Sequence, residues 1–306
     1  MTTLKLQNIH EDNPRDFLAA LGLLRLIDTS WPELETALSW SDHCPILRFS
    51  GQLSETWSEE LTLALQALAS APENPLFHGD VIKTSAGNFR AAIRNAQGFP
   101  EKSDSPLKKI PALLYAAYSS QLTDDSGEYV IPTAFSFCNG QGGKKLLLDV
   151  SQLISSLNPF EFQETMVGTA KPKDAKSFRW NPSEYQVASY RSHDPGSGIS
   201  GDINYDFPAL NILAFIGLSF FPSVPQNKNG NTLGMAKDAK KRFFRWPVWG
   251  ELLVPSEISI ILGSDIVNTG DRNSCLSLGI ERAWESPRFT DDKGNTYFLR
   301  SRPAFV

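Results

Sequence analysis

The clearest hydrophobic pattern lies near the N-terminus and predicts a mostly buried helix over residues 13–28. Asn13 is a good N-cap and Pro14 is preorganised for the first helical turn. Gly22 in the middle costs about 1 kcal/mol relative to Ala, so we expect another backbone to pack closely against it. The apolar positions recur three and four residues apart, at Phe17, Leu18, Leu21, Leu24 and Ile27.

The same criteria predict a mixture of helices and strands in the rest of the chain. Further helices are expected at residues 55–69, 111–120, 145–156 and 207–220. Strands are expected at 37–40, 46–49, 129–137, 178–180, 187–191, 243–249, 258–262, 275–284 and 297–300. Polar and glycine-rich stretches predict loops at 84–110, 194–202 and 226–234.

These elements indicate an α+β fold with two lobes, in which mixed or antiparallel sheets carry flanking helices. Lys and Pro become frequent past residue 160, which places the boundary between the lobes near residue 165. The N-terminal lobe would span residues 1–165 and contain a glycine-rich loop at 137–145. The C-terminal lobe would span 166–306 and contain the basic segments.

Composition and charge narrow the function classes. The 306 residues are 41% hydrophobic and 21% charged, as in an ordinary globular protein. With 29 Lys+Arg against 34 Asp+Glu, the net charge of −5 excludes a globally basic protein that coats DNA. Residues 1–80 contain 4 basic and 12 acidic side chains, which leaves 25 basic and 22 acidic ones in the rest. An anionic partner is therefore expected beyond residue 80.

The chain carries no sign of secretion or membrane insertion. Its first ten residues lack the basic start and apolar core of a signal peptide. The most apolar stretch, 207–221, is shorter than the roughly 20 residues of a bilayer span. Cys44, Cys138 and Cys275 form no CxxC pair, so neither a zinc ribbon nor a disulfide framework is indicated. We predict a cytoplasmic protein with no cofactor and no metal.

Catalytic motifs are sparse. His193-Asp194 matches the HD dipeptide of metal-dependent phosphohydrolases, but it leads directly into the turn sequence Pro195-Gly-Ser-Gly. There is no GxSxG elbow and no HExxH helix. We therefore interpret the chain as a protein without catalytic activity. A metal-dependent nuclease or phosphohydrolase using His193 and Asp194 stays open as the alternative.

A glycine-rich segment, FCNGQGGKK at residues 137–145, is the most conspicuous local feature. It fails the P-loop pattern, because Cys138 stands where that pattern needs Gly and Lys145 where it needs Ser or Thr. Glycines before a helix N-terminus still let backbone N–H groups approach a phosphate. The candidate nucleic-acid contacts are Asn139, Gln141, Lys144 and Lys145; a plain strand-to-helix turn is the alternative.

Two further segments combine basic and aromatic residues. We expect the aromatics of the second to alternate into a core and the basic side chains to form a face for phosphate. A purely solvated face is the alternative for the charges. The first segment contains Lys171, Lys173, Lys176 and Arg179 before Trp180; the second contains Lys237, Lys240, Lys241, Arg242 and Arg245 among Phe243, Phe244 and Trp246.

Several short segments together resemble the large-subunit-like proteins of type I-U (also called I-G) CRISPR-Cas systems. They are NPRDFLAALGLL at 13–24, AFSFCNGQG at 134–142, FRWNP at 178–182 with Tyr190-Arg191, residues 211–222, and RWPVW at 245–249. The small size and the lack of a helical C-terminal bundle depart from that group, which suggests a separate small subunit.

This resemblance implies a non-catalytic subunit of a Cascade-type effector that supports RNA-guided antiviral defence. Its partners would be other Cascade-type subunits, a guide RNA and target double-stranded DNA, which it would contact near the protospacer-adjacent motif. Arg191 would join Arg179 in a shared core motif. A helicase-nuclease of the same system is a further candidate partner. The alternatives are a protein-only scaffold, whose acidic N-terminal lobe docks a basic protein, and an accessory subunit associated with the helicase-nuclease.

Overall fold

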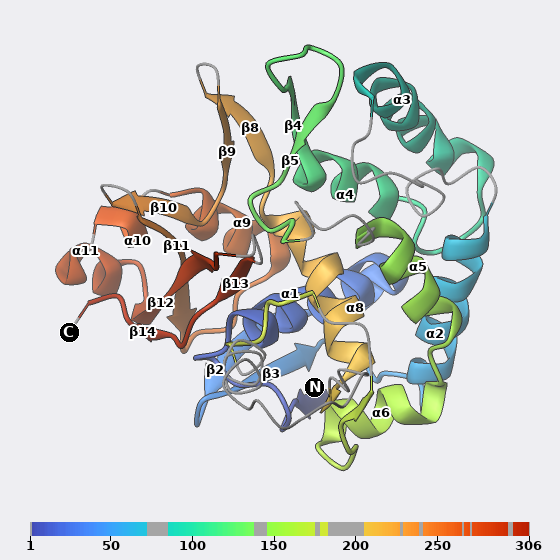
Figure 1. The fold of residues 1–306 in the computed structure, drawn as a ribbon. Helices are drawn as coiled ribbons and strands as arrows, with labels where there is room; N and C mark the ends of the chain where they lie inside the picture. The colour runs from blue at the N-terminus through green and yellow to red at the C-terminus, as the bar shows by residue number, and fades with distance from the viewer. Residues whose placement is uncertain are drawn as a thin grey trace, which may run out of the picture.

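The computed structural model describes residues 2–71, 85–137, 146–174, 178–182, 205–226, 229–238, 241–264, 266–269, 271–292 and 296–305. They form an α+β fold in which every described strand pairing is antiparallel (Figure 1). The helices are α1 Pro14–Ser30, α2 Trp57–Ser70, α3 Ala86–Lys102, α4 Ile110–Tyr118, α5 Leu146–Ser155, α6 Pro159–Val167, α8 Pro208–Gly217, α9 Pro255–Gly263, α10 Ile266–Thr269 and α11 Arg272–Ser277, with 3-10 turns η1 Pro32–Leu34 and η2 Leu218–Phe220.

The strands form two larger sheets and three two-stranded ones. The N-terminal sheet has the order β1-β3-β2, from Thr2–Lys5, Cys44–Phe49 and Ala37–Ser41. The C-terminal sheet has the order β10-β11-β12-β13, from Met235–Asp238, Lys241–Trp249, Ile280–Thr290 and Thr296–Phe298, and β14 Arg302–Pro303 also pairs with β12. The small pairs are β4 Ser119–Thr123 with β5 Val130–Pro132, β6 Lys173–Asp174 with β7 Tyr205–Asp206, and β8 Ser223–Gln226 with β9 Asn229–Thr232.

Helices α1 and α8 cross at the centre of the molecule, with α2 to α6 on one side and the C-terminal sheet on the other (Figure 1). Two glycines make the crossing close. A Cβ at Gly22 would lie 1.8 Å from the Leu213 carbonyl oxygen, and one at Gly217 would lie 2.0 Å from the Leu18 oxygen. The predicted close approach at Gly22 is thus confirmed, because no other residue leaves room for the facing backbone.

One continuous cluster of buried apolar side chains includes residues on both sides of the predicted boundary at residue 165. Phe17 on α1 lies at its centre, with ring centroids 5.9 Å from Trp246 and 6.3 Å from Phe244 on β11. The prediction that the aromatics of β11 face a core is confirmed, since Phe244, Trp246 and Trp249 are all buried.

Three predicted segments differ in the structure. Residues 86–102 form helix α3 instead of a loop, because Ser85 caps the first turn and apolar side chains recur every three to four residues. Residues 255–263 form helix α9 instead of a strand, since Pro255 begins the helix and the Glu257 carboxylate accepts from the Val254 N–H at 3.0 Å. The predicted loop at 226–234 contains strand β9 and the end of β8, which pair with each other.

Smaller differences concern element ends. Helix α11 continues to Ser277 before β12 begins at Ile280, so only part of the predicted strand 275–284 forms. In the same way, β5 covers only Val130–Pro132 of the predicted strand 129–137. Residues 178–180 are irregular instead of extended strand. Helix α6 had no predicted counterpart, although Asn158 caps it and Pro159 begins it.

Candidate nucleic-acid interface

The register of the C-terminal sheet brings three basic side chains into one row. Lys237 on β10 pairs with Arg242 on β11, and Arg242 pairs with Arg288 on β12. Directly paired residues lie on the same face of a sheet, so the three side chains are neighbours. We call Lys237, Arg242 and Arg288 the basic row. Phe244 and Trp246 lie on the same face of β11 as Arg242, but they are buried. The basic row therefore lies at the edge of the core.

The basic row has no carboxylate to neutralise it among the described residues, where none of its members forms an ion pair. Like charges directly opposite each other on neighbouring strands destabilise a sheet. Burial lowers the pKa of the Arg288 guanidinium below its ordinary value, and the charge of Arg242 lowers that pKa further. The Arg288 Nε is buried and without a hydrogen-bond partner in the described structure. The fold thus gathers positive charge here without compensating it.

The basic row lies next to residues 134–137, which precede the glycine-rich segment and which we call its stem. The Arg288 guanidinium carbon lies 5.4 Å from the centroid of the Phe137 ring, and the Phe137 ring lies 4.7 Å from the ring of Phe298. Trp180 Nε1 donates to the Phe135 carbonyl at 2.8 Å, which ties the stem to the FRWNP motif. The predicted contacts Asn139, Gln141, Lys144 and Lys145 themselves lie outside the described residues.

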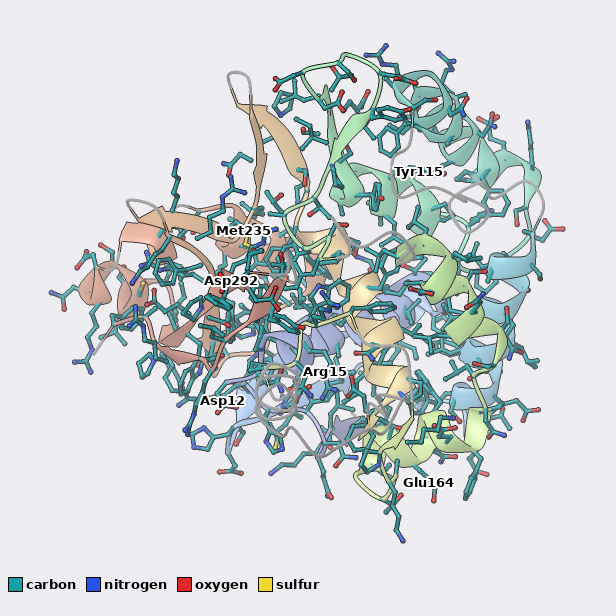
Figure 2. All side chains as sticks on the ribbon, viewed as in Figure 1. Asp12, Arg15, Tyr115, Glu164, Met235 and Asp292 are labelled. Atoms are coloured by element: carbon teal, nitrogen blue, oxygen red, sulfur yellow. The ribbon has the colours of Figure 1, made fainter. Side chains whose placement is uncertain are left out.

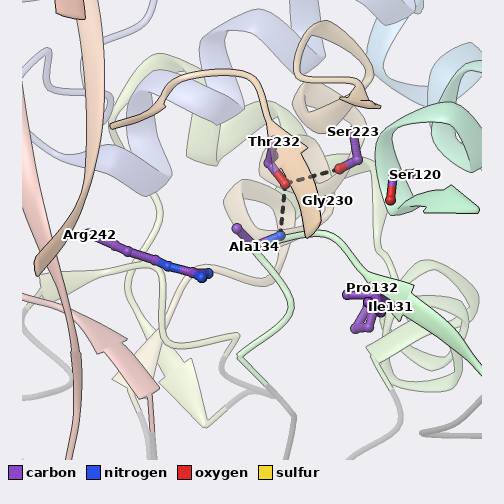
Figure 3. Close-up of a pocket in the computed structure, with 8 residues that line it drawn as sticks. All are labelled: Ser120, Ile131, Pro132, Ala134, Ser223, Gly230, Thr232 and Arg242. Carbon is purple, nitrogen blue, oxygen red and sulfur yellow. Dashed lines mark hydrogen bonds between the residues drawn. The ribbon is translucent and has the colours of Figure 1, made fainter. Parts of the chain in front are cut away.

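A small cavity opens beside Arg242, with a volume of about 100 Å³. Figure 3 shows the Arg242 side chain extending toward Ala134 from the left, with Thr232 and Ser223 above Ala134 and Ser120 at the right. The Ala134 N–H donates to Thr232 Oγ1 at 3.0 Å. The lining residues are Ser120, Ile131, Pro132, Ala134, Ser223, Gly230, Thr232 and Arg242.

Arg245, also a predicted contact, lies on the opposite face of β11 and has internal partners. Its Nε donates to Glu285 Oε2 at 2.7 Å, and its Nη1 donates to the Asn268 carbonyl at 3.1 Å. Arg302 binds the other oxygen of the same carboxylate, with its Nη2 2.6 Å from Glu285 Oε1. Arg245 therefore serves to hold β12, α10 and the C-terminal segment together.

The first basic segment is not brought to the basic row as one cluster. Lys171 and Lys173 are exposed, and Lys173 Nζ forms an ion pair with Glu161 Oε2 on α6 at 2.6 Å. Arg179 is buried at a positive φ of 62°, and its guanidinium carbon lies 4.9 Å from the Tyr297 ring centroid. Lys241 is exposed on β11 beside the row but on the other strand face.

The other predicted residues, Lys176, Arg191 and Lys240, fall outside the described part of the chain, as do His193 and Asp194. Within the described ranges, no three His, Cys, Asp or Glu side chains gather closely enough to hold a metal ion. No helix in these ranges has the length and apolar character needed to cross a bilayer.

Sequence reasoning missed Arg288 and the cavity hydroxyls. Arg288 stands in no local basic cluster, and only the pairing of β12 with β11 brings it next to Arg242. Its own strand, IERAWESPRFT at 280–290, mixes charged, polar and apolar residues, so nothing in the local sequence singles Arg288 out. Ser120 and Thr232 are ordinary in sequence and meet only because β4 and β9 lie side by side.

The segments that carry the family resemblance meet in the interior. Asn13 Nδ2 donates to Asn181 Oδ1 at 3.3 Å, which joins the first motif to FRWNP. Arg15 forms buried ion pairs with Asp16 and Asp206, and Figure 2 shows it on α1 in the middle of the molecule. Asp206 in turn accepts from Asn211 Nδ2 at 2.9 Å. These motif residues hold the core together.

No known family model matches the chain, and no curated protein is significantly similar to it.

Proposed function

We propose that the chain is a non-catalytic, nucleic-acid-binding subunit of a Cascade-type CRISPR-Cas effector. It would act in the cytoplasm beside other Cascade-type subunits and a guide RNA, and contact target DNA near the protospacer-adjacent motif. The sequence resemblance to the type I-U large-subunit-like proteins supports the assembly. The basic row supports the contact with nucleic acid.

The observation that carries the binding role is a row of cations that the described fold does not neutralise. Neighbouring arginines without a carboxylate are unfavourable in the free protein. Phosphate groups would supply the missing negative charge and would release their condensed counterions on binding. Arginine suits this role because its planar guanidinium stays charged and donates two parallel hydrogen bonds to a phosphate.

The mechanism that follows is non-covalent. Lys237, Arg242 and Arg288 would hold the sugar-phosphate backbone. The anchored stem at residues 134–137 would hold the start of the glycine-rich segment next to that backbone, where Asn139 and Gln141 could pair with base edges. Base pairing with the guide RNA would supply the sequence specificity.

Co-expression of the tagged chain with its genomic neighbours and a CRISPR array tests the assembly. The proposal predicts that the chain co-purifies with repeated backbone subunits and with a guide RNA of uniform length. A chain that purifies with proteins alone, and whose complex has no affinity for DNA, would overturn the proposal and favour the scaffold alternative. Cleavage of labelled nucleic acid upon adding Mn²⁺ or Mg²⁺, lost on His193→Ala, would favour the metal-dependent enzyme.

A further inference from the structure

Two of the three hydroxyls that line the cavity beside Arg242 have hydrogen-bond partners. Ser223 Oγ donates to the Ala117 carbonyl at 3.1 Å, so the Thr232 hydroxyl, 3.0 Å away, donates to Ser223. Thr232 Oγ1 also accepts from the Ala134 N–H. Ser223 and Thr232 are thereby satisfied.

Ser120 is the exception. The residue is 6% exposed, and its Oγ is buried without a hydrogen-bond partner in the part of the chain that the structure describes. A buried hydroxyl left without a partner costs about 1–3 kcal/mol. Gly230 faces it, and a Cβ there would lie 2.9 Å from Ser120 Oγ. The glycine therefore packs directly against this hydroxyl, and any larger residue at position 230 would press onto it.

The charged side chain that lines the cavity is positive. Arg242 lines it and Arg288 stands beside Arg242 on the same sheet face, while no acidic side chain of the described residues lines the cavity. A site that offers a hydroxyl and guanidinium donors fits a ligand group that only accepts hydrogen bonds and carries negative charge.

The cavity volume limits what enters. Pockets that enclose a whole drug-sized ligand measure about 300–1,000 Å³, whereas this one measures about 100 Å³. The space suits a tetrahedral anion but not a complete nucleotide. A phosphate at the end of a molecule can insert into such a cavity, whereas an internal phosphodiester would have to bring two sugars with it.

We propose that this cavity binds a terminal phosphate, a phosphate monoester held by Arg242 on one side, where Arg288 adds charge from the neighbouring strand, and by the Ser120 hydroxyl on the other. The monoester belongs either to the end of a nucleic-acid strand or to a free nucleotide. The inference goes beyond the proposed contact with the backbone, and it does not require the Cascade-type assembly.

Fluorescence polarisation with two labelled single strands of identical sequence tests the proposal. One strand carries a 5′-phosphate and the other a 5′-hydroxyl. A charge-assisted hydrogen bond of average strength predicts that the phosphorylated strand binds about tenfold more tightly. Ser120→Ala and Gly230→Ala should each reduce this ratio to below about threefold without changing the affinity for the hydroxyl strand. Ser126→Ala, in the exposed turn between β4 and β5, is the matched control and should keep the full ratio.

Competitors separate the two sources of the monoester. Displacement by AMP, with a rise in melting temperature that Ser120→Ala abolishes, assigns the site to free nucleotides. Displacement only by phosphorylated strands assigns it to strand ends. Equal affinity for both strands together with no thermal shift by AMP would overturn the inference, while any binding of the hydroxyl strand would leave the proposed backbone contact standing.

Discussion

The two faces of the C-terminal sheet carry two pairs of arginines with opposite surroundings. On one face, Arg245 and Arg302 share the buried carboxylate of Glu285, at 2.7 and 2.6 Å. On the other face, Arg242 and Arg288 lie directly opposite each other, with no carboxylate between them among the described side chains. The same residue type in the same sheet is thus neutralised internally on one face only.

This difference separates structural from binding residues more clearly than the sequence pattern does. Arg242 and Arg245 belong to one basic cluster in the sequence, three residues apart. Strand alternation sends them to opposite faces, where one meets an internal anion and the other does not. An arginine that has its counter-charge inside the fold contributes to stability, whereas an arginine without one is available to an external anion.

The largest expected effect on stability comes from removing the Glu285 carboxylate that Arg245 and Arg302 share. Glu285→Gln removes the charge shared by two arginines and should lower the free energy of unfolding by about 3 kcal/mol, the low end for a broken buried ion pair. Arg302 is 63% exposed and recovers some hydration, which keeps the loss near that end. Urea denaturation monitored by tryptophan fluorescence measures the change.

Glu281→Gln on the same strand is the control, because Glu281 is about half exposed and lies 3.6 Å from Arg282. It should change the free energy of unfolding by less than about 0.5 kcal/mol. Similar small effects of the two substitutions would contradict the structural role of Glu285.

A smaller effect of opposite sign is expected on the other face. Arg242→Gln removes one of two facing cations and should leave the free energy of unfolding unchanged or raise it by up to about 1 kcal/mol. Adding 0.5 M NaCl should remove this gain, because salt already screens the repulsion in the parent protein. A loss of 2 kcal/mol or more would show that Arg242 has a structural partner.

The smallest effect is expected at Lys171, which is exposed and lies on the segment that the fold does not bring to the basic row. Lys171→Ala should leave both the stability and the salt dependence of nucleic-acid binding within error of the parent values. A decrease in affinity as large as that of Arg242→Gln would extend the interface to the β6 region.

The helix α1 and the core aromatics of β11 could be predicted from the sequence, because their periodicity and caps are local. The close backbone contact at Gly22 could also be predicted, because a glycine inside a helix is destabilising and is expected there only where another backbone packs against it. Helix α9 was mistaken for a strand because Ile258–Leu262 is a short apolar run that periodicity alone does not assign.

The candidate site could be predicted only in part. The basic character of residues 237–245 was visible, but the division of Arg242 from Arg245 depends on which face of β11 is covered. Arg288 and Ser120 are distant in sequence from Arg242. Strand pairing places Arg288 beside Arg242, and the packing of β4 against the β8–β9 hairpin brings Ser120 to the cavity that Arg242 lines. Such long-range juxtapositions leave no local signal.

The salt dependence of nucleic-acid affinity tests the central claim most directly. For duplex DNA, each phosphate contact contributes about −0.9 to the slope of log K against log salt. In the purified complex, the double variant Arg242→Gln/Arg288→Gln should reduce the magnitude of that slope by about 2. The charge-matched control Lys5→Ala/Arg48→Ala, on the exposed side of the N-terminal sheet, should leave it unchanged. Equal slopes for the parent and the Arg242/Arg288 variant would contradict the claim that the basic row binds phosphate.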